Sequence, residues 1–415
     1  MQPITSDTSR KTVLYLSYDG MLEPLGQSQV FGYLKRMSQD PDYHFILVSF
    51  EKCKDWEDKP RVNEIRALMT NANIEWIPLK YHKNPPHLAT AIDILTCTMH
   101  AISLAFKRRI AIVHARSYIP AISALFLKRA FGIKFIFDMR GFWADERADS
   151  GQWTHTSLTY RCIKGLEKQF LLNADAVISL THAGVKEMET FPYLKTHRPE
   201  FHVIPTCANL DEFKLFESRD TKSFWIGHIG SIGSWYLFDE ALLFFKNLQK
   251  LRPDARLLIL NRNEHEKIKK ALMIHQITDE SYELMSANHD EMAGYLSRLD
   301  AAVFFIKPFY SKKASAPTKL AELLGCGIPC VVNSGVGDMD LLFQDKSLGV
   351  CVADYREKTL LDAAKVLLEL RQDQESSTRR RSHALRYFSA KQGSQDYLNV
   401  YRKVLLKSVH QKNAV

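Results

Sequence analysis

Short, continuous apolar segments recur along the chain, and helical stretches separate them. In the first half they cover residues 13–17, 45–49, 74–77, 110–114, 135–138, 176–179 and 202–204. Their β-branched and aromatic residues are typical of strands buried on both faces. Helical periodicity lies between them, for example at 28–38, 88–107 and 159–173. Because parallel strands need crossover helices, this alternation predicts a doubly wound parallel sheet.

The same pattern then starts again. Further strand-like segments cover 223–227, 255–260, 282–285, 301–306, 330–332 and 350–352, with helical stretches at 237–250, 264–275, 290–299 and 318–324. A chain of 415 residues is too long for one ordinary core. We therefore expect two Rossmann-like α/β domains, residues 1–205 and 206–390. Open parallel sheets bind ligands beyond the carboxyl ends of their strands, so two such sheets predict a ligand cleft between the domains.

The end of the chain, 391–415, predicts a helix that docks on the body. Within 394–408 one helical face is apolar and aromatic; it carries Tyr397, Val400, Tyr401, Val404 and Leu405. The polar face is not strongly basic, which argues against a membrane anchor.

Charge narrows the range of partners. The formal net charge is +9, and 25% of residues are charged, an ordinary globular content that excludes disordered and fibrous proteins. Seven basic residues occur with no acidic residue between positions 101 and 137: Lys107, Arg108, Arg109, Arg116, Lys128, Arg129 and Lys134. No nucleic-acid-binding motif accompanies them, so nucleic acid is not expected as a partner. An anionic membrane surface and a solvated basic face remain as explanations.

Other features indicate a soluble, cytoplasmic protein. No apolar run is expected to reach the roughly 18 residues of a membrane span, because polar residues interrupt 92–106. The N-terminus shows neither a basic start nor an apolar core, so no secretory signal is expected. The seven cysteines form no CxxC pair, which favours buried thiols in a reducing compartment.

A glycine-rich loop follows one of the strand-like segments. In Gly227-His-Ile-Gly230-Ser231-Ile-Gly233 the glycines allow a phosphate to approach the backbone. The spacing is GxxGxxG rather than GxGxxG, and the next strand ends at Asn261 instead of an acidic residue, which disfavours a nicotinamide enzyme. The alternative is a strand-to-helix turn that needs glycine only for its geometry.

A second group of polar residues surrounds the start of a predicted helix. Pro317 and Thr318 suit a helix N-terminus, and Lys319 and Glu322 share one face of that helix. A cation there can neutralise a diphosphate, and a carboxylate can accept hydrogen bonds from a ribose diol. The alternative is a surface ion pair at spacing i, i+3.

Taken in order, these motifs resemble those of the glycosyltransferase family 4 enzymes. Residues 315–332 resemble their nucleotide-sugar segment, and 230–235 resemble their second phosphate loop. The early loop 18–29, with Gly26 and Gln27, occupies the place of their first glycine-rich loop, and 202–205 matches their interdomain connection. The similarity extends over residues 12–405.

The resemblance implies the two-domain GT-B fold and a retaining glycosyltransferase. A nucleoside-diphosphate sugar would bind the C-terminal domain, and an acceptor hydroxyl would bind the N-terminal domain. No metal and no cofactor beyond the sugar nucleotide are implied. A glycan or lipid-linked acceptor in cell-surface polysaccharide assembly is the expected setting, with the protein peripheral on the inner membrane face.

The same resemblance implies roles for particular residues. The donor would contact Gly230, Ser231, Asn261, Ser315, Thr318, Lys319 and Glu322. The amides of Gly230 and Ser231, together with Lys319, would stabilise the departing phosphate, and 285–289 would present backbone to the base. The catalytic group would comprise Lys319, Arg140, Asp138 and His114, and the acceptor side Gly26, Gln27 and Arg116. Structural roles remain as alternatives for Arg140, as an ion pair, and for His114, at a strand end.

Two positions depart from the expected pattern. Many family members carry an acidic residue near the transferred sugar where this chain has Ala314. Asp338-Met-Asp340 spells DxD, a metal-binding signature of another glycosyltransferase fold, but its place in a glycine turn favours a helix cap. A nucleotide-sugar epimerase or hydrolase, and a non-catalytic nucleotide-binding relative, are the alternative functions.

Overall fold

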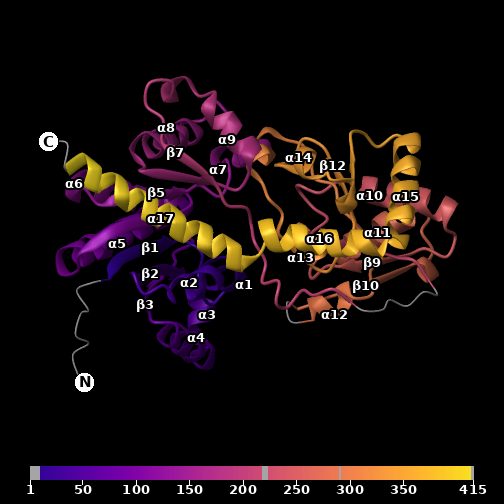
Figure 1. Ribbon diagram of the computed structural model, residues 1–415, viewed down its shortest axis with the longest axis horizontal. Coiled ribbons are helices and arrows are strands. Elements are labelled where there is room, and N and C mark those ends of the chain that lie inside the picture. Colours follow the sequence, from indigo (N-terminus) through magenta and orange to yellow (C-terminus); the bar gives the residue numbers. More distant parts are fainter. Residues whose placement is uncertain (1–9, 217–222, 289–290, 413–415) are drawn as a thin grey trace. The chain divides into compact units, whose positions relative to one another are not determined.

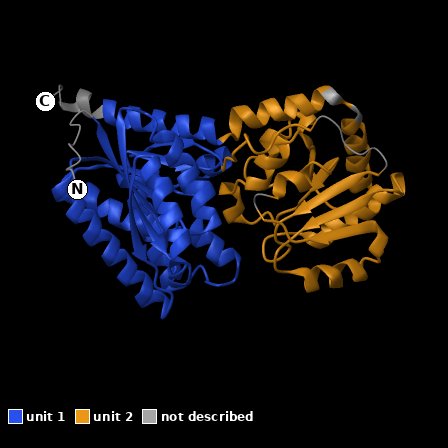
Figure 2. Ribbon diagram, turned by 90° about the horizontal axis from the view of Figure 1, so that it is seen from below, with its two compact units in different colours: residues 1–205, 390–415 blue, residues 206–389 orange. Residues whose placement is uncertain are grey.

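The computed structural model describes residues 10–216, 223–288 and 291–412, and the chain divides into two compact units (Figure 2). Unit 1 comprises residues 1–205 and 390–415, and unit 2 comprises residues 206–389. Each unit contains one parallel sheet covered by helices (Figure 1). The prediction of two parallel-sheet α/β domains is confirmed.

The sheet of unit 1 has seven strands in the order β3-β2-β1-β4-β5-β6-β7, and all neighbouring pairs are parallel. The strands are β1 Lys11–Ser17, β2 Tyr43–Glu51, β3 Ile74–Lys80, β4 Ile110–Arg116, β5 Lys134–Asp138, β6 Ala176–Ser179 and β7 Glu200–Val203. The α-helices before the unit boundary are α1 Pro24–Gly26, α2 Gly32–Met37, α3 Cys53–Glu57, α4 Lys59–Asn71, α5 Pro86–Lys107, α6 Tyr118–Phe131, α7 Trp143–Asp149, α8 Leu158–Asn173 and α9 His182–Glu189.

The sheet of unit 2 has six parallel strands in the order β10-β9-β8-β11-β12-β13. They are β8 Trp225–Ile229, β9 Arg256–Leu260, β10 Tyr282–Met285, β11 Ala301–Val303, β12 Cys330–Asn333 and β13 Gly349–Val352. The α-helices are α10 Phe238–Leu251, α11 His265–Ile274, α12 Met292–Leu296, α13 Thr318–Gly325, α14 Met339–Leu342, α15 Glu357–Gln372 and α16 Gln374–Tyr387.

The last helix, α17 Ala390–Lys412, belongs to unit 1 although it follows unit 2 in sequence (Figure 1). It packs against α2, and its buried side chains include Tyr397 and Tyr401. The Tyr33 ring meets Tyr397 edge-on at 5.3 Å between centroids, and the hydroxyl of Ser394 donates to the Tyr33 carbonyl oxygen. The aromatic face that the sequence predicts is the face that covers unit 1.

Strand β8 runs two residues further than the sequence predicts. Gly227 and His228 therefore lie inside the strand, and the glycine loop begins only at Gly230. A Cβ atom on Gly227 would lie 2.4 Å from a methyl carbon of Leu299, so a larger residue here would have to displace that buried side chain. The cysteines also differ in part from the prediction, because Cys53 and Cys162 are exposed.

Helix α5 corrects the expectation that no segment is long and apolar enough to cross a membrane. It has 22 residues, its most apolar 18-residue window has a mean hydropathy of 1.5, and only 28% of that window is buried. The helix connects β3 to β4 within the sheet of unit 1. It is the one helix of the described chain that meets this criterion of length and composition.

Candidate active site

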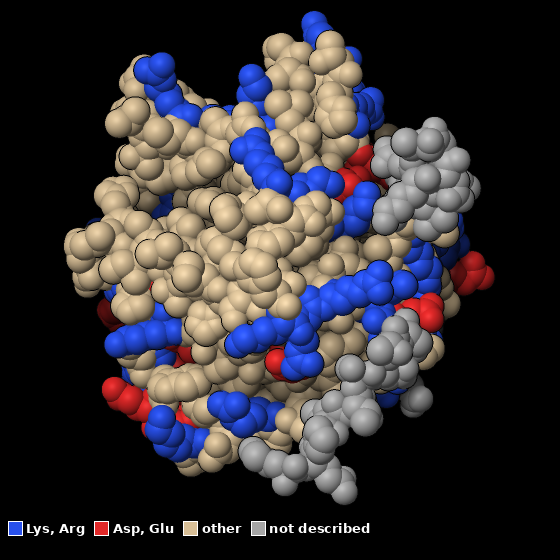
Figure 3. Space-filling model, turned by 90° about the vertical axis from the view of Figure 1, so that its left-hand side faces the viewer, with Lys and Arg blue, Asp and Glu red and all other residues tan. Residues whose placement is uncertain are grey.

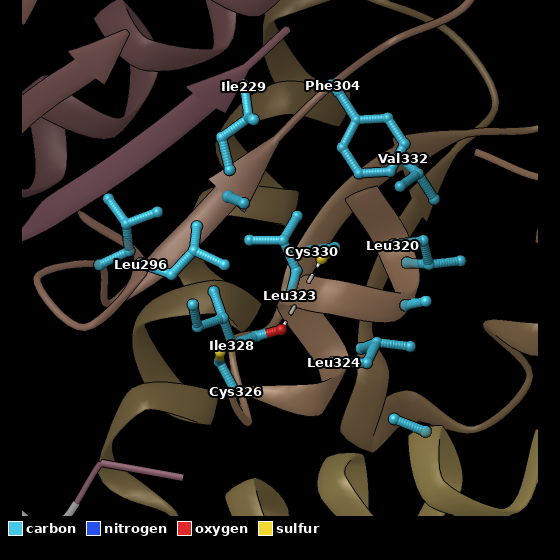
Figure 4. Packing of buried hydrophobic residues seen from close by; sticks show 14 of the residues in the cluster. Ile229, Leu296, Phe304, Leu320, Leu323, Leu324, Cys326, Ile328, Cys330 and Val332 are labelled. Carbon is cyan, nitrogen blue, oxygen red and sulfur yellow. Dashed lines mark hydrogen bonds between the residues drawn. The ribbon is translucent and has the colours of Figure 1, made fainter. Parts of the chain in front are cut away.

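Helix α13 is anchored in unit 2 by its apolar face. Leu320, Leu323 and Leu324 are buried and belong to the same core cluster as Ile229 at the end of β8 (Figure 4). Pro317 stands before the helix with extended backbone, and Thr318 is the first helical residue. The core therefore fixes the first turn of α13 relative to the end of β8, and Lys319 lies in that turn.

Lys319 occupies a nearly dry position beside the glycine loop. Its side chain is only 9% exposed, and its Nζ donates a hydrogen bond to the carbonyl oxygen of Ile229. The ammonium also lies over the Tyr236 ring, 4.1 Å from the centroid. Gly230 has a φ of +97°, and a Cβ atom there would lie 3.1 Å from Nζ. The structure thus brings Gly230 and Lys319 together, as the sequence predicts.

The Lys319–Glu322 pair is not a surface ion pair. Burial lowers the pKa of Lys319 to about 7, although the charge of Glu322 acts in the opposite direction. Burial raises the pKa of Glu322 to about 7, and the charge of Lys319 opposes that rise. No described residue forms a salt bridge or side-chain hydrogen bond with Glu322. A buried cation and an unpaired carboxylate one turn apart suit a ligand that carries both an anion and hydroxyl groups.

The glycine loop is organised by Glu264, which the sequence analysis did not single out. Its Oε2 accepts hydrogen bonds from the Ser231 hydroxyl at 2.6 Å and from the Ile232 amide at 3.0 Å. The Gly230 amide donates to the carbonyl oxygen of Leu260 at 2.8 Å. The expectation that the Gly230 amide is free for a phosphate is therefore wrong in this structure, because the sheet already uses it. The Ser231 hydroxyl likewise has an internal acceptor.

Asn261 supports this arrangement. Its side-chain nitrogen donates to Gly230 O at 3.0 Å and to Glu264 at 3.1 Å, while its side-chain oxygen accepts from the Glu264 amide at 2.7 Å. Asn261 and Glu264 thus form a turn that holds the loop. Their i, i+3 spacing just before a helix is the sequence pattern from which this turn could have been predicted.

The remaining donor-side residues surround the start of α13. The hydroxyls of Ser315 and Thr318 are half-buried and bond to no described side chain or backbone group. Ala314 is buried at the end of the 3-10 turn Tyr310–Ala314, so its methyl group lies within the packing. The stretch 285–289, which is predicted to present backbone to the base, is described only to Asn288, and His289 lies outside the described residues.

In unit 1, the predicted group gathers around the buried carboxylate of Asp138. The Tyr397 hydroxyl donates to Asp138 Oδ2 at 2.9 Å, and the same oxygen lies 3.6 Å from His114 Nε2 and 3.9 Å from an Arg116 nitrogen. Arg140 lies 3.9 Å from the other carboxylate oxygen. Burial alone would raise the pKa of Asp138, but the positive charge of Arg140 and contact with His114 hold that pKa below its ordinary value.

His114 does not face a ligand as expected. It is fully buried and lies two residues before the C-terminal end of β4. Its ring stacks on Tyr15, with 4.3 Å between ring centroids, and its Nδ1 is hydrogen-bonded to the Tyr401 hydroxyl at 2.8 Å. Burial lowers the pKa of His114, so its neutral form is favoured. The structural alternative for this residue therefore fits better, with His114 as a positioning group for Asp138.

Arg116 and Arg140 lie at the carboxyl ends of adjacent strands. Arg116 is almost fully buried, and its Nε donates to Asp19 in the early loop at 2.9 Å. Arg140 is partly exposed and has a positive φ of 60°, a strained backbone conformation for a residue with a side chain. Arg140 is thus the member of this group best placed to reach a ligand.

The early loop has its own close approaches. A Cβ atom on Gly26 would lie 1.9 Å from the carbonyl oxygen of Gly20, so only glycine fits there. The Gln27 side chain donates to the Met21 carbonyl oxygen at 3.2 Å. Both residues shape the loop, and their contact with an acceptor remains a prediction.

Metal ligands do not converge in the described part of the chain, where no three His, Cys, Asp or Glu side chains are grouped to hold an ion. Asp338 occupies the position before α14, and Asp340 accepts a hydrogen bond from the Gly335 amide at 2.8 Å. The DxD sequence is thus part of a glycine turn.

Two protein families match the sequence of this chain. A family described as Glycosyltransferase Family 4 matches residues 26–212, and one described as Glycosyl transferases group 1 matches residues 211–384. The chain belongs to glycosyltransferase family 4. The two matches adjoin near residue 211, close to the boundary between the two units. No curated protein matches the sequence.

Solved structures show the same fold at low sequence identity. Sucrose-phosphate synthase from Thermosynechococcus elongatus has 14% identity and a TM-score of 0.69, with 96% of this chain and 100% of that chain covered. A glycosyltransferase from Rickettsia africae has 14% identity and a TM-score of 0.66, covering 95% and 99%. Anabaena HepE, solved in complex with UDP-glucose, has 13% identity and a TM-score of 0.64, covering 94% and 99%. The glycosyltransferase therefore has the GT-B fold.

Proposed function

We propose that this glycosyltransferase moves a sugar from a nucleoside-diphosphate sugar to a hydroxyl group of a glycan or lipid-linked acceptor, with retention of the anomeric configuration. The observation that supports this most is the buried ammonium of Lys319 beside the turn at Gly230. A buried cation without an anionic partner at salt-bridge distance suits a diphosphate. HepE, which has the same fold, was solved with UDP-glucose, and this supports a nucleotide sugar as donor.

In the proposed reaction, the bond between the anomeric carbon and the diphosphate oxygen breaks. Negative charge grows on the departing phosphate, and Lys319 stabilises it in surroundings that exclude water. The half-buried hydroxyls of Ser315 and Thr318 offer further donors. Glu322 would accept hydrogen bonds from the ribose diol, for which an unpaired carboxylate is suited.

Unit 1 would bind the acceptor near Arg140 and the early loop. Arg140 would supply positive charge to a ligand bound by unit 1, while Asp138 and the buried His114 keep its guanidinium in place. No strong nucleophile presents itself, and this agrees with departure and attack on the same face of the sugar. Retention itself is proposed from family membership.

Product analysis with and without acceptor tests this function. We expect a new glycoside only when acceptor and sugar nucleotide are both present, with slow hydrolysis of the sugar nucleotide alone. Rapid acceptor-independent release or epimerisation of the sugar would indicate the alternative enzyme classes. Binding of nucleotide without turnover would indicate a non-catalytic relative, which the buried Ala314 makes worth testing.

A variant at Glu322 tests the ribose contact. We expect Glu322→Gln to raise the donor KM with a smaller effect on kcat, because the interaction is the same in the ground state and the transition state. Glu266→Gln, on the exposed face of α11, is the matched control and should leave KM unchanged. Equal donor affinity in both variants would contradict ribose binding by Glu322.

Metal independence and the setting in the cell are also part of the proposal. We expect activity to persist in excess EDTA, because Lys319 supplies the positive charge for the diphosphate and Glu322 accepts hydrogen bonds from the ribose.

The proposed setting is cell-surface polysaccharide assembly at the cytoplasmic face of a membrane. Loss of a surface glycan in a deletion strain is the measurement that checks it.

A further inference from the structure

Helix α5 carries an apolar stripe that no described element covers. Its exposed large residues are Leu88, Ile92, Leu95, Met99 and Phe106. Their spacing of four, three, four and seven residues places them on one helical face. Leu95 is 63% exposed and Phe106 is 77% exposed. A monomeric soluble protein rarely leaves a contiguous row of this kind in water.

The neighbouring helix α6 extends this surface. Phe131, at its end, is exposed and meets Phe106 edge-on with ring centroids 5.3 Å apart. We call the exposed side chains of Leu88, Ile92, Leu95, Met99, Phe106 and Phe131 the apolar face.

Basic residues lie near the end of the apolar face, in a stretch of sequence that contains no acidic residue. Between residues 94 and 137 the sequence contains no Asp or Glu. Lys107 and Arg109 are exposed and pair with no described acidic group, whereas Lys128 pairs with Asp175 at 2.6 Å. Figure 3 views the side where α5 and α6 are labelled in Figure 1, and it shows a broad uncharged area bordered by Lys and Arg side chains.

The opposite face of α5 is bound into unit 1. Asp93 is fully buried and accepts hydrogen bonds from the Tyr18 hydroxyl at 2.7 Å and from the His82 amide at 3.2 Å. The helix also connects two strands of the sheet, so it cannot cross a bilayer without leaving the fold. An apolar stripe on a fixed helix can still enter the headgroup and upper acyl region, as interfacial helices do.

We propose that the apolar face of α5 and α6 docks unit 1 on an anionic lipid bilayer. The apolar side chains enter the interface, and Lys107 and Arg109 contact lipid phosphates. Tyr18, which Asp93 holds, adjoins Asp19, and Asp19 pairs with Arg116 in the predicted acceptor group. Docking would therefore bring the early loop close to lipid. This inference concerns binding alone and does not depend on sugar transfer.

Vesicle co-sedimentation of the full chain tests the proposal. We expect binding to phosphatidylcholine vesicles that contain phosphatidylglycerol, weak binding to pure phosphatidylcholine, and weakening as salt is added. Leu95→Glu/Met99→Glu should reduce affinity by about tenfold or more, and Lys107→Glu/Arg109→Glu should reduce it and flatten the salt dependence. No binding of the natural sequence to anionic vesicles at low salt would overturn the proposal.

Matched controls lie in unit 2. Met273→Glu/Ile274→Glu changes two exposed apolar residues of α11, and Lys269→Glu/Lys270→Glu changes two exposed lysines of that helix. Both control variants should bind as the natural sequence does; equal losses in controls and test variants would overturn the proposal. Light scattering distinguishes the other occupant: if Leu95→Glu/Met99→Glu converts a dimer to a monomer without changing vesicle binding, the face is a contact between copies.

Discussion

A lysine that is nine-tenths buried and forms no salt bridge with a described residue carries a cost for the folded state, and Lys319 is such a residue. Its position next to Gly230 explains the cost if the residue serves a ligand. A residue retained for stability would be expected to have a buried acceptor of opposite charge at bonding distance. A substitution of this side chain can therefore lower activity while it raises stability.

Replacement of Lys319 should lower activity and raise stability. We expect Lys319→Met to reduce kcat by about 30- to 900-fold, which corresponds to about 2–4 kcal/mol of lost transition-state stabilisation. The same variant should melt at a higher temperature than the natural sequence. Unchanged turnover would remove Lys319 from the mechanism, and a lower melting temperature at every pH would contradict its cost to stability.

The pH dependence of that stabilisation has a definite sign. Because the pKa of Lys319 is lowered from 10.5 to about 7 on folding, the unfolded chain binds more protons between these values. The cost of the charged lysine is present in full below pH 7 and disappears as the pH rises toward 10.5. The stabilisation in Lys319→Met should therefore be largest at pH 6 and smallest near pH 10, as measured by denaturant unfolding across that range.

Binding of a nucleoside diphosphate should take up a proton near pH 8. At that pH a lysine with a pKa of about 7 is mostly neutral, and an adjacent diphosphate raises this pKa. Titration calorimetry in buffers of different ionisation enthalpy measures the uptake. The uptake should fall in Lys319→Met, and an equal uptake in both proteins would assign the proton to another group.

At the scale of elements, α17 completes a site built by the strands of unit 1. Tyr397 and Tyr401 reach Asp138 and His114 across more than two hundred and fifty positions of sequence. The loop after β8 is held in a comparable way by Glu264, at the start of α11. In both units a short polar group is positioned by an element distant in sequence.

Removal of one hydroxyl from α17 tests this coupling. We expect Tyr397→Phe to destabilise unit 1 by about 1–3 kcal/mol, because the buried carboxylate of Asp138 loses a hydrogen-bond donor. Tyr387→Phe, at an exposed position of α16, should have little effect on denaturant unfolding. Equal stabilities of the two variants would show that Asp138 has another donor.

At the scale of the whole molecule, the chain passes from unit 1 to unit 2 and returns. Each unit has a parallel sheet and buried hydrophobic residues of its own. Residues 206–389 therefore contain the whole donor group from Gly230 to Glu322, whereas the Asp138 group is incomplete without residues after 389.

Fragments of the chain should show that unit 2 folds without α17 and that unit 1 does not. We expect residues 206–389 expressed alone to fold and to melt at a higher temperature when a nucleoside diphosphate is added. A chain that ends at Ser389 should retain this response but lose the folding of unit 1, because the apolar faces covered by Tyr397 and Val404 would be exposed. Native-like melting of both units in that truncated chain would contradict the assigned role of α17.

The sequence by itself determined the two parallel sheets, since each strand is a short apolar run and its period is a local property. It also indicated Lys319 and Glu322, because their spacing on one helix fixes their relative direction. Tertiary structure alone decided that His114 is buried, that the Glu264 carboxylate accepts hydrogen bonds from the glycine loop, and that one apolar face of α5 is exposed. Burial and hydrogen-bond partners depend on residues far apart in sequence, so no local pattern records them.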